Sequence, residues 1–203
     1  MCVAKKTETS EKISLPSSYT LIAADLSLKR PGFCVLKIEE KDGCPAISDF
    51  YLASVDNKTK TKPRGQLLDE IAKAFLNLLE RSQTPVFLVR EQSVNNCGGN
   101  IVRSGTAART GISSVVGVMD LIAWQHAHLS WEEFYPVTIK KLLTGYGKAE
   151  KKQVANALSA YLGDHTYKND DESDAAAVAV AWLINHDQMK QIIQEDTSSE
   201  RSK

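Results

Sequence analysis

The feature that most constrains the fold is a run of small apolar residues that directly follows a cluster of acids. Residues 175–181 read AAAVAVA, and DESD at 171–174 stands immediately before them. A helix that is apolar around most of its circumference has to be buried, so this segment requires a sheet or other helices around it. An ionised carboxylate at the mouth of such a helix is costly without a partner. Asp171 and Asp174 therefore either cap the helix, with Asp171 at the N-cap, or bind something positive.

Upstream of this segment, strand-like and helix-like patterns alternate. Apolar runs joined by short polar turns predict an antiparallel meander of three strands at 19–28, 32–40 and 47–55. Further patterns predict a helix at 65–82, a strand at 84–91, a helix at about 106–125, a strand at 131–137, and helices at 138–147, 149–163 and 171–187. This order predicts one α/β domain whose five-stranded sheet is of mixed direction and is flanked by helices.

The composition is that of an ordinary soluble domain. Of the 203 residues, 42% are hydrophobic and 25% are charged, and the formal net charge is +0, so global charge gives no argument for a nucleic-acid partner. No apolar run reaches the roughly 18 residues of a membrane span, and the cysteines lack disulfide or zinc spacing. We expect a cytoplasmic protein without membrane contact, in the host cytoplasm if the chain is viral. Residues 1–17 and 191–203 are predicted to be disordered tails of a domain at 18–190.

Two further carboxylates stand where strands are predicted to end. Asp25 follows the apolar LIAA of the first strand, and Glu91 follows VFLVR of the fourth. If these strands are neighbours, both acids can meet at one edge of the sheet, beside Asp171 and Asp174. Four convergent acids would repel one another unless cations lie among them, and hard oxygen ligands favour Mg²⁺, with Mn²⁺ as a substitute. Such a site can hold two metals about 4 Å apart and displace a phosphodiester.

Each of these acids also has a simpler interpretation when it is considered alone. Asp25 could open a turn before Ser27, and Glu91 could form an ion pair with Arg90 at the end of its strand. The coincidence of all the acids at compatible ends favours the metal site.

Four segments of the chain resemble RuvC-type Holliday-junction resolvases, which belong to the ribonuclease H-like superfamily. LIAADLSLKRPGFCVL is similar to the first strand and hairpin of that family, and VFLVREQ to the strand with its second acid. FYPVTIKKLLTGYGKAEKKQV resembles its most recognisable stretch, and DDESDAAAVAVAWL its last acid pair and helix. The matches occur in family order over most of residues 20–186. The resemblance implies a ribonuclease H-like fold.

The resemblance also assigns roles to individual residues. It implies that Asp25, Glu91, Asp171 and Asp174 are catalytic metal ligands, and that Lys140 and Lys151 are functional lysines that stabilise charge at the scissile phosphate. Solvated surface lysines remain the alternative for both. Candidate DNA-phosphate contacts are Lys29, Arg30, Arg103, Arg109, Lys148 and Lys152.

Two further expectations depend on the resemblance. The family commonly has an aromatic residue shortly after the second acid, where this chain has Val94, so its cleavage-sequence preference is in doubt. The helix at 106–125 has more apolar residues than one narrow stripe. In the family this helix helps to form a two-fold dimer, which would suit paired nicks. The alternative is a central core helix in a monomer.

The function that these observations favour is a Mg²⁺-dependent endonuclease that resolves Holliday junctions by symmetric nicks during recombination and repair, leaving 5′-phosphate and 3′-hydroxyl ends. A related nuclease for other branched DNA or RNA–DNA hybrids would use the same acids. A sugar-kinase-like ATPase would need a second lobe and a Gly-rich nucleotide loop. A non-catalytic nucleic-acid-binding protein is disfavoured because all four acids and both lysines are present.

Overall fold

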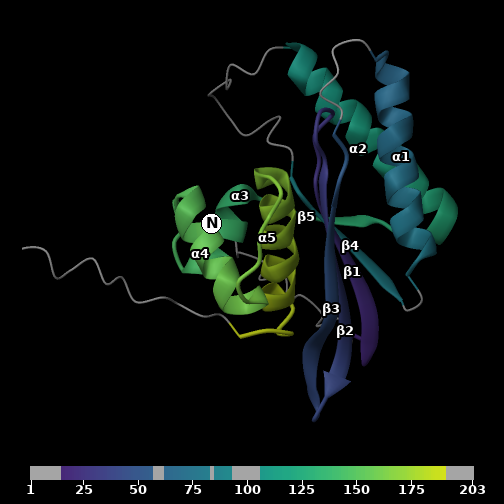
Figure 1. Cartoon of the computed structure of the whole chain (residues 1–203). Coiled ribbons are helices and arrows are strands. Elements are labelled where there is room, and N and C mark those ends of the chain that lie inside the picture. Colours follow the sequence, from purple (N-terminus) through teal and green to yellow (C-terminus); the bar gives the residue numbers. More distant parts are fainter. Residues whose placement is uncertain (1–14, 57–61, 83–84, 93–105, 191–203) are drawn as a thin grey trace, which may run out of the picture.

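The computed structural model describes residues 15–56, 62–82, 85–92 and 106–190. The strands are β1 (Ser18–Asp25), β2 (Gly32–Lys41), β3 (Cys44–Ser54), β4 (Val86–Glu91) and β5 (Trp131–Phe134). The helices are α1 (Arg64–Glu80), α2 (Thr106–Ala127), α3 (Pro136–Thr144), α4 (Lys151–Leu162) and α5 (Asp170–Asn185). The predicted elements are present in the predicted order (Figure 1). Most of both predicted tails lies outside the described residues, and the domain bounds stay a prediction.

The five strands form one mixed sheet in the order β3-β2-β1-β4-β5. The first three strands are antiparallel neighbours, as the short turns between them predicted. The turn between β2 and β3 is tight because Asp42 and Gly43 both adopt positive φ angles, of 54° and 76°. β4 runs parallel to β1, and β5 runs parallel to β4. The predicted α/β fold class with a mixed five-stranded sheet is therefore confirmed.

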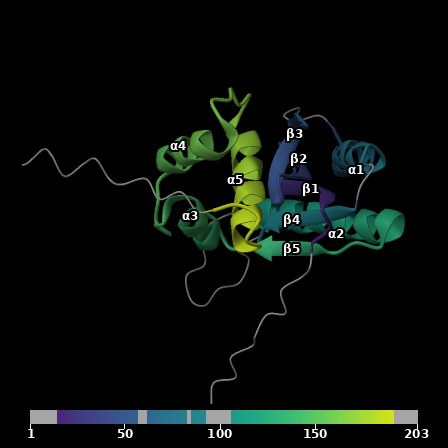
Figure 2. The same cartoon turned by 90° about the horizontal axis from the view of Figure 1, so that it is seen from below.

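Helices cover both faces of this sheet. One layer consists of α1 and α2, and the other of α3, α4 and α5 (Figures 1 and 2). Side chains of β1 alternate between the layers: Leu21 and Ala23 belong to the core beneath α5, whereas Ile22 and Ala24 belong to the core beneath α1 and α2. Because both faces are buried, the strand has a continuous apolar run instead of a polar alternation.

The small-residue helix α5 is buried, as its composition predicted. All residues from Ala175 to Ile184 are at most 8% exposed. The helix packs against β1, β2 and β4, the strands nearest the centre of the sheet. Its first turn is therefore held at a fixed place relative to the ends of these strands.

Two predicted boundaries differ from the structure for identifiable reasons. β5 ends at Phe134 and not at residue 137, because Pro136 takes the first position of α3, where its missing N–H is tolerated. α4 begins at Lys151 because Glu150 and Gln153 form a capping box that defines its start.

Helix α2 is buried on one side only within the chain. Val115, Met119 and Ala123 face the sheet and have no exposed surface, whereas Leu121 is 54% and Trp124 is 62% exposed. Helix α2 is therefore not enclosed on all sides by the described part of the chain, and the choice between a dimer and a monomer stays a prediction. Among the described helices, none combines the length and apolar character that crossing a bilayer requires.

Candidate active site

Two of the predicted acids lie side by side at the carboxyl edge of the sheet. The parallel pairing of β1 with β4 ends with Ala24 opposite Arg90, so Asp25 and Glu91 follow at equivalent positions of neighbouring strands. Side chains of a strand alternate between its faces, and Ala23 and Val89, two residues earlier, both lie in the core beneath α5. Asp25 and Glu91 therefore belong to the face that α5 covers.

The other two acids come from the N-terminal part of α5, with Asp171 in its first turn and Asp174 three residues later. The N-cap is Asn169, whose side chain accepts a hydrogen bond from the backbone N–H of Glu172. The prediction that Asp171 is the N-cap is thus wrong: the cap lies two residues earlier, and Asp171 and Asp174 are free to project from the helix. The backbone of Asp171 lies close to the backbone of β2 at Gly32. A Cβ added to Gly32 would be only 2.5 Å from the Asp171 carbonyl carbon.

Crowding of these carboxylates alters their proton affinity. Burial, followed by the negative charges of Asp174 and Asp171, raises the pKa of Asp25 to about 6, although the Lys151 ammonium acts in the opposite direction. Burial likewise raises the pKa of Glu91 to about 7, together with the charges of Asp25 and Asp174, while Lys140 and Lys151 act in the opposite direction. Acids from β1, β4 and α5 therefore interact as one group.

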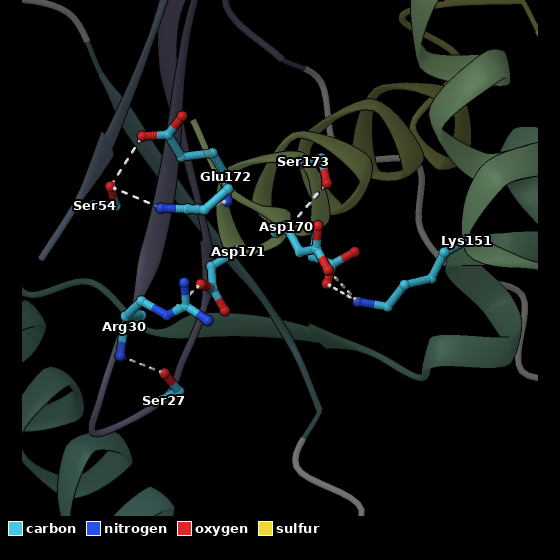
Figure 3. A network of polar contacts seen from close by, with 10 residues as sticks. Ser27, Arg30, Ser54, Lys151, Asp170, Asp171, Glu172 and Ser173 are labelled. Carbon is cyan, nitrogen blue, oxygen red and sulfur yellow. Dashed lines mark hydrogen bonds and ion pairs between the residues drawn. The ribbon is translucent and has the colours of Figure 1, made fainter. Parts of the chain in front are cut away.

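Two cations balance part of this negative charge. The Lys151 ammonium donates a hydrogen bond to Asp174 at 3.2 Å and lies 3.6 Å from Asp170. Arg30 Nε lies 3.4 Å from Asp171 Oδ2. In Figure 3 the two cations approach the start of α5 from opposite sides. The hydrogen bond to Asp174 is the largest influence on the pKa of Lys151 and raises it, outweighing the opposite effect of burial. The lysine is therefore stabilised in its charged form.

The simpler interpretations of Asp25 and Glu91 are not what the structure shows. Arg90 turns away from Glu91 and binds Glu133, with its Nε and Nη2 atoms 2.8 and 2.6 Å from one carboxylate oxygen. The turn after β1 is made by Ser27, whose hydroxyl accepts a hydrogen bond from the Arg30 backbone N–H at 2.9 Å. Neither acid is therefore explained by a strand-end ion pair or by the turn.

The remaining predicted residues are distributed around this group. Lys140, on α3, is half-buried and close enough to Glu91 to influence its pKa. Lys29, Lys148 and Lys152 are exposed near the same edge, in the turn after β1 and at the start of α4. Arg103 and Val94 lie outside the described residues. Arg109 lies on α2, but its side chain is also outside the described part.

Several residues that build this site were not predicted from the sequence. Glu172 is 2% exposed and binds Ser54 on β3, and Asn169 caps the helix. Gly32 leaves room for the helix backbone. A periodicity signal was available for Glu172, because Ala175, Ala176 and Ala179 follow it at helical spacing on the buried side.

The donor set suits a hard divalent cation. Its four side chains offer carboxylate oxygens only, which Mg²⁺ and Mn²⁺ prefer. Asp171 Oδ2 is buried and accepts no hydrogen bond, since Arg30 contributes an ion pair without hydrogen-bond geometry. Within the described ranges, no three His, Cys, Asp or Glu side chains already stand in position to hold an ion. Asp171 and Asp174 instead contact Arg30 and Lys151, respectively.

The raised pKa values predict how pH affects the metal-free protein. A carboxyl whose pKa is higher in the folded chain stabilises the fold below its unfolded pKa and loses that contribution as the pH rises through its folded pKa. For Asp25 and Glu91 this loss begins at pH about 4 and is complete above their folded pKa values of about 6 and about 7. We expect urea denaturation in EDTA to show a free energy of unfolding that falls, by on the order of 2 kcal/mol per group, up to pH about 8.

The matched variant for this pH effect is Glu91→Gln, which keeps the size of the side chain and removes the titration. Its free energy of unfolding should fall less over the same pH range, and it should exceed that of the wild type at pH about 8. Equal pH slopes in the two proteins would contradict the raised pKa of Glu91.

Comparison with known proteins agrees with this geometry. A family model described as "Crossover junction endodeoxyribonuclease RuvC" matches residues 28–182. The crossover junction endodeoxyribonuclease RuvC of Rickettsia bellii is 33% identical over 136 residues, which cover 66% of this chain and 81% of that protein. The family match includes Glu91, Asp171 and Asp174 but begins after Asp25, whose place in the site follows from strand pairing.

Solved structures with the same fold point in the same direction. RuvC of Thermus thermophilus in complex with a Holliday junction substrate matches with a TM-score of 0.64 at 18% identity, over 80% of this chain and 92% of that one. A fowlpox virus resolvase in complex with Holliday junction DNA matches with a TM-score of 0.51 at 10% identity, over 82% and 97%. At these identities the structures establish the fold, which is ribonuclease H-like. Together with the family match, they show that the chain belongs to the RuvC family of crossover junction endodeoxyribonucleases.

Proposed function

We propose that this protein is a Mg²⁺-dependent endonuclease that resolves four-way DNA junctions by paired symmetric nicks. The observation that carries the proposal is the convergence of acids from β1, β4 and α5 on one edge of the sheet, in a chain of the RuvC family. For such an activity we infer a cytoplasmic location, as expected for a protein whose relatives are bacterial.

The proposed mechanism uses the side chains that meet at this edge. Asp25, Glu91, Asp171 and Asp174 would hold Mg²⁺, with Mn²⁺ as a possible substitute. When bound, the metal would activate a water for attack and stabilise the leaving oxygen of the phosphodiester. Lys151 lies within hydrogen-bond distance of Asp174, so its ammonium is placed to stabilise negative charge that develops on the scissile phosphate.

Further cations on the same edge would bind the DNA backbone. Lys29 follows β1, and Lys148 and Lys152 flank Lys151 at the start of α4, so all three exposed lysines belong to segments that also contribute residues to the site. Lys140 and Arg30 lie closer to the carboxylates, beside Glu91 and Asp171. Such phosphate contacts release counterions, so the affinity for a junction should fall steeply as salt increases.

We further propose that the exposed side of α2 pairs two copies of the chain. Leu121 and Trp124 stand about one turn apart on the helix surface opposite the core, and a Cβ on Gly117, one turn before Leu121, would meet nothing within 4 Å. A two-fold contact between such surfaces would bury both apolar side chains and give the complex two active sites for two strands.

The variant Trp124→Glu tests this dimer. Size-exclusion chromatography with light scattering should give a dimer for the wild type and a monomer for Trp124→Glu, because an ionised carboxylate is costly at an apolar contact. Asn77→Glu, which adds the same charge on the exposed side of α1, should remain a dimer. A wild-type monomer at micromolar concentration that still nicks both strands would contradict the proposal.

The substrate class is tested by offering four DNA or hybrid substrates of related sequence with Mg²⁺. A four-way junction, a flap, a linear duplex and an RNA–DNA hybrid would be compared under single-turnover conditions. We expect paired cutting of the junction at least about tenfold faster than cutting of any other substrate, a preference of about 1.4 kcal/mol. Faster cutting of the flap or the hybrid would instead identify a related nuclease with a different substrate.

A further inference from the structure

Glu172 is a buried carboxylate in the first turn of α5, between two proposed metal ligands in the sequence. Its side chain turns away from Asp171 and toward the sheet (Figure 3). Ser54 Oγ donates a hydrogen bond to Glu172 Oε1 at 2.9 Å, and the Lys168 backbone N–H donates to Oε2 at 3.0 Å. With 2% of its surface exposed, the residue depends on these donors, because a buried carboxylate without them would be destabilising.

The hydrogen bond from Ser54 attaches Glu172 to a line of paired residues across the sheet, and this line also includes Asp25. In the strand register Asp25 is opposite Gly32, and Gly32 is opposite Ser54, so the three residues form one line across β1, β2 and β3. Each has a different relation to α5: Asp25 is a proposed ligand, Gly32 admits the backbone of Asp171, and Ser54 binds Glu172. The first turn of α5 is therefore attached to the same line that fixes the first acid.

We propose that Glu172, through Ser54, is a positioning residue that fixes Asp171 and Asp174 relative to Asp25 and thereby sets the metal affinity of the site. This inference rests on the proposed function, because it takes these aspartates as metal ligands. The ends of helices fray when their terminal groups lack partners. Losing the partners that orient metal ligands typically costs roughly 10–100-fold in affinity or activity.

Glu172 could affect metal binding by positioning Asp171 and Asp174 or by its own negative charge. The variant Glu172→Gln distinguishes these two effects. Its amide oxygen can accept the hydrogen bond from the Lys168 N–H, and its amide nitrogen can donate to the Ser54 hydroxyl, which is both a donor and an acceptor. Glutamine therefore keeps both attachments and removes only the negative charge. Glu172→Ala removes the attachments and the charge together.

The experiment is a titration of each protein with Mn²⁺ in the absence of DNA, with the free ion measured by electron paramagnetic resonance. We expect Glu172→Ala to raise the dissociation constant about tenfold or more, and Glu172→Gln to stay within about twofold of the wild type. Ser54→Ala should raise it by a smaller factor. The double variant should bind less weakly than the sum of the two single effects predicts, because both changes remove the hydrogen bond between Ser54 and Glu172, although Ser54→Ala also removes the 3.4 Å contact with Asn169 Nδ2.

A matched control separates positioning from a general loss of stability. Phe75→Leu alters the core beneath α1 and α2, on the other face of the sheet, and should lower stability without changing the Mn²⁺ dissociation constant. Weaker binding in Phe75→Leu that scales with its loss of stability would overturn the positioning role.

Several other outcomes would overturn the proposal. An unchanged dissociation constant in folded Glu172→Ala is one, and equal weakening in Glu172→Gln and Glu172→Ala is another, since that result would assign the effect to charge. If Glu172→Ala does not fold, Ser54→Ala decides: weaker Mn²⁺ binding supports the proposal, and unchanged binding overturns it. Asp174→Asn is titrated in parallel. If it binds Mn²⁺ as the wild type does, the metal site itself is wrong, whereas a failure confined to Glu172 leaves the proposed function intact.

Discussion

Asp174→Asn is expected to abolish Mg²⁺-dependent cleavage of a four-way junction while leaving junction binding intact. Asp174 raises the pKa of both Asp25 and Glu91 and accepts a hydrogen bond from Lys151, so it lies at the centre of the site. Replacing it with an amide removes one anionic ligand and leaves the size of the side chain unchanged. Since a metal contributes several kcal/mol to transition-state stabilisation, the rate should fall at least about 1,000-fold.

The measurement pairs single-turnover cleavage in Mg²⁺ with fluorescence anisotropy of a labelled junction in EDTA. Binding should change by no more than about threefold, because phosphate contacts with lysines and arginines supply most of the affinity. The control is Asp69→Asn, the same substitution at an exposed carboxylate on α1 that pairs with Lys73. Cleavage by Asp174→Asn within about tenfold of the wild-type rate, a change of only about 1.4 kcal/mol, would contradict the role of Asp174.

Gly32→Ala is expected to impair both stability and cleavage. A Cβ at this position would overlap the carbonyl oxygen of Asp171 and would lie 3.1 Å from the Glu172 backbone nitrogen. These are backbone atoms of a buried helix and cannot rotate away, so the first turn of α5 must move off the sheet. Such overpacking costs roughly 1–3 kcal/mol, and a displacement of about 1 Å can cost about 100-fold in rate.

Urea denaturation and single-turnover cleavage measure the two effects of Gly32→Ala. The control is Gly65→Ala on α1, where an added Cβ meets nothing within 4 Å and alanine favours the helix. It should keep the wild-type rate and be as stable as the wild type or slightly more stable. If Gly32→Ala were as stable and as active as Gly65→Ala, the close approach of α5 to β2 would be wrong.

The sequence can predict on which face of the sheet Asp25 and Glu91 lie, because side chains alternate regularly between the two faces of a strand. Asp25 and Glu91 each stand two residues after a residue of the core beneath α5, so their faces were implied once their strands were neighbours. That pairing is a long-range contact, and a local pattern does not contain it. The sequence left this pairing as a condition, and the parallel register of β1 and β4 meets that condition.

The start of α5 was harder to predict because its sequence offers several equivalent caps. Asn169, Asp170 and Asp171 are all good N-cap residues. What selects Asn169 is the seating of the helix on the sheet, in which Glu172 must reach Ser54 and the backbone must pass Gly32. Both partners belong to a hairpin more than 100 residues earlier in the chain, so the choice depends on tertiary packing.

The sequence shows that α2 has more apolar residues than one buried stripe needs. It does not show which of them pack inside the chain and which stay exposed. Val115 and Met119 pack on the sheet, and Leu121 and Trp124 on the other side remain exposed. A sequence pattern counts apolar residues without showing which neighbours exist to cover them. Among the described residues the fold supplies neighbours for one side of α2 only, and this is why we propose a second copy of the chain for the other side.

The most direct test of the account is to locate the metal in crystals of the protein grown with Mn²⁺ and a junction, using anomalous diffraction at the manganese edge. We expect anomalous peaks whose protein ligands are carboxylate oxygens of Asp25, Glu91, Asp171 and Asp174, with Lys151 beside the nearest phosphate. Manganese bound to DNA and to none of these four carboxylates would contradict it.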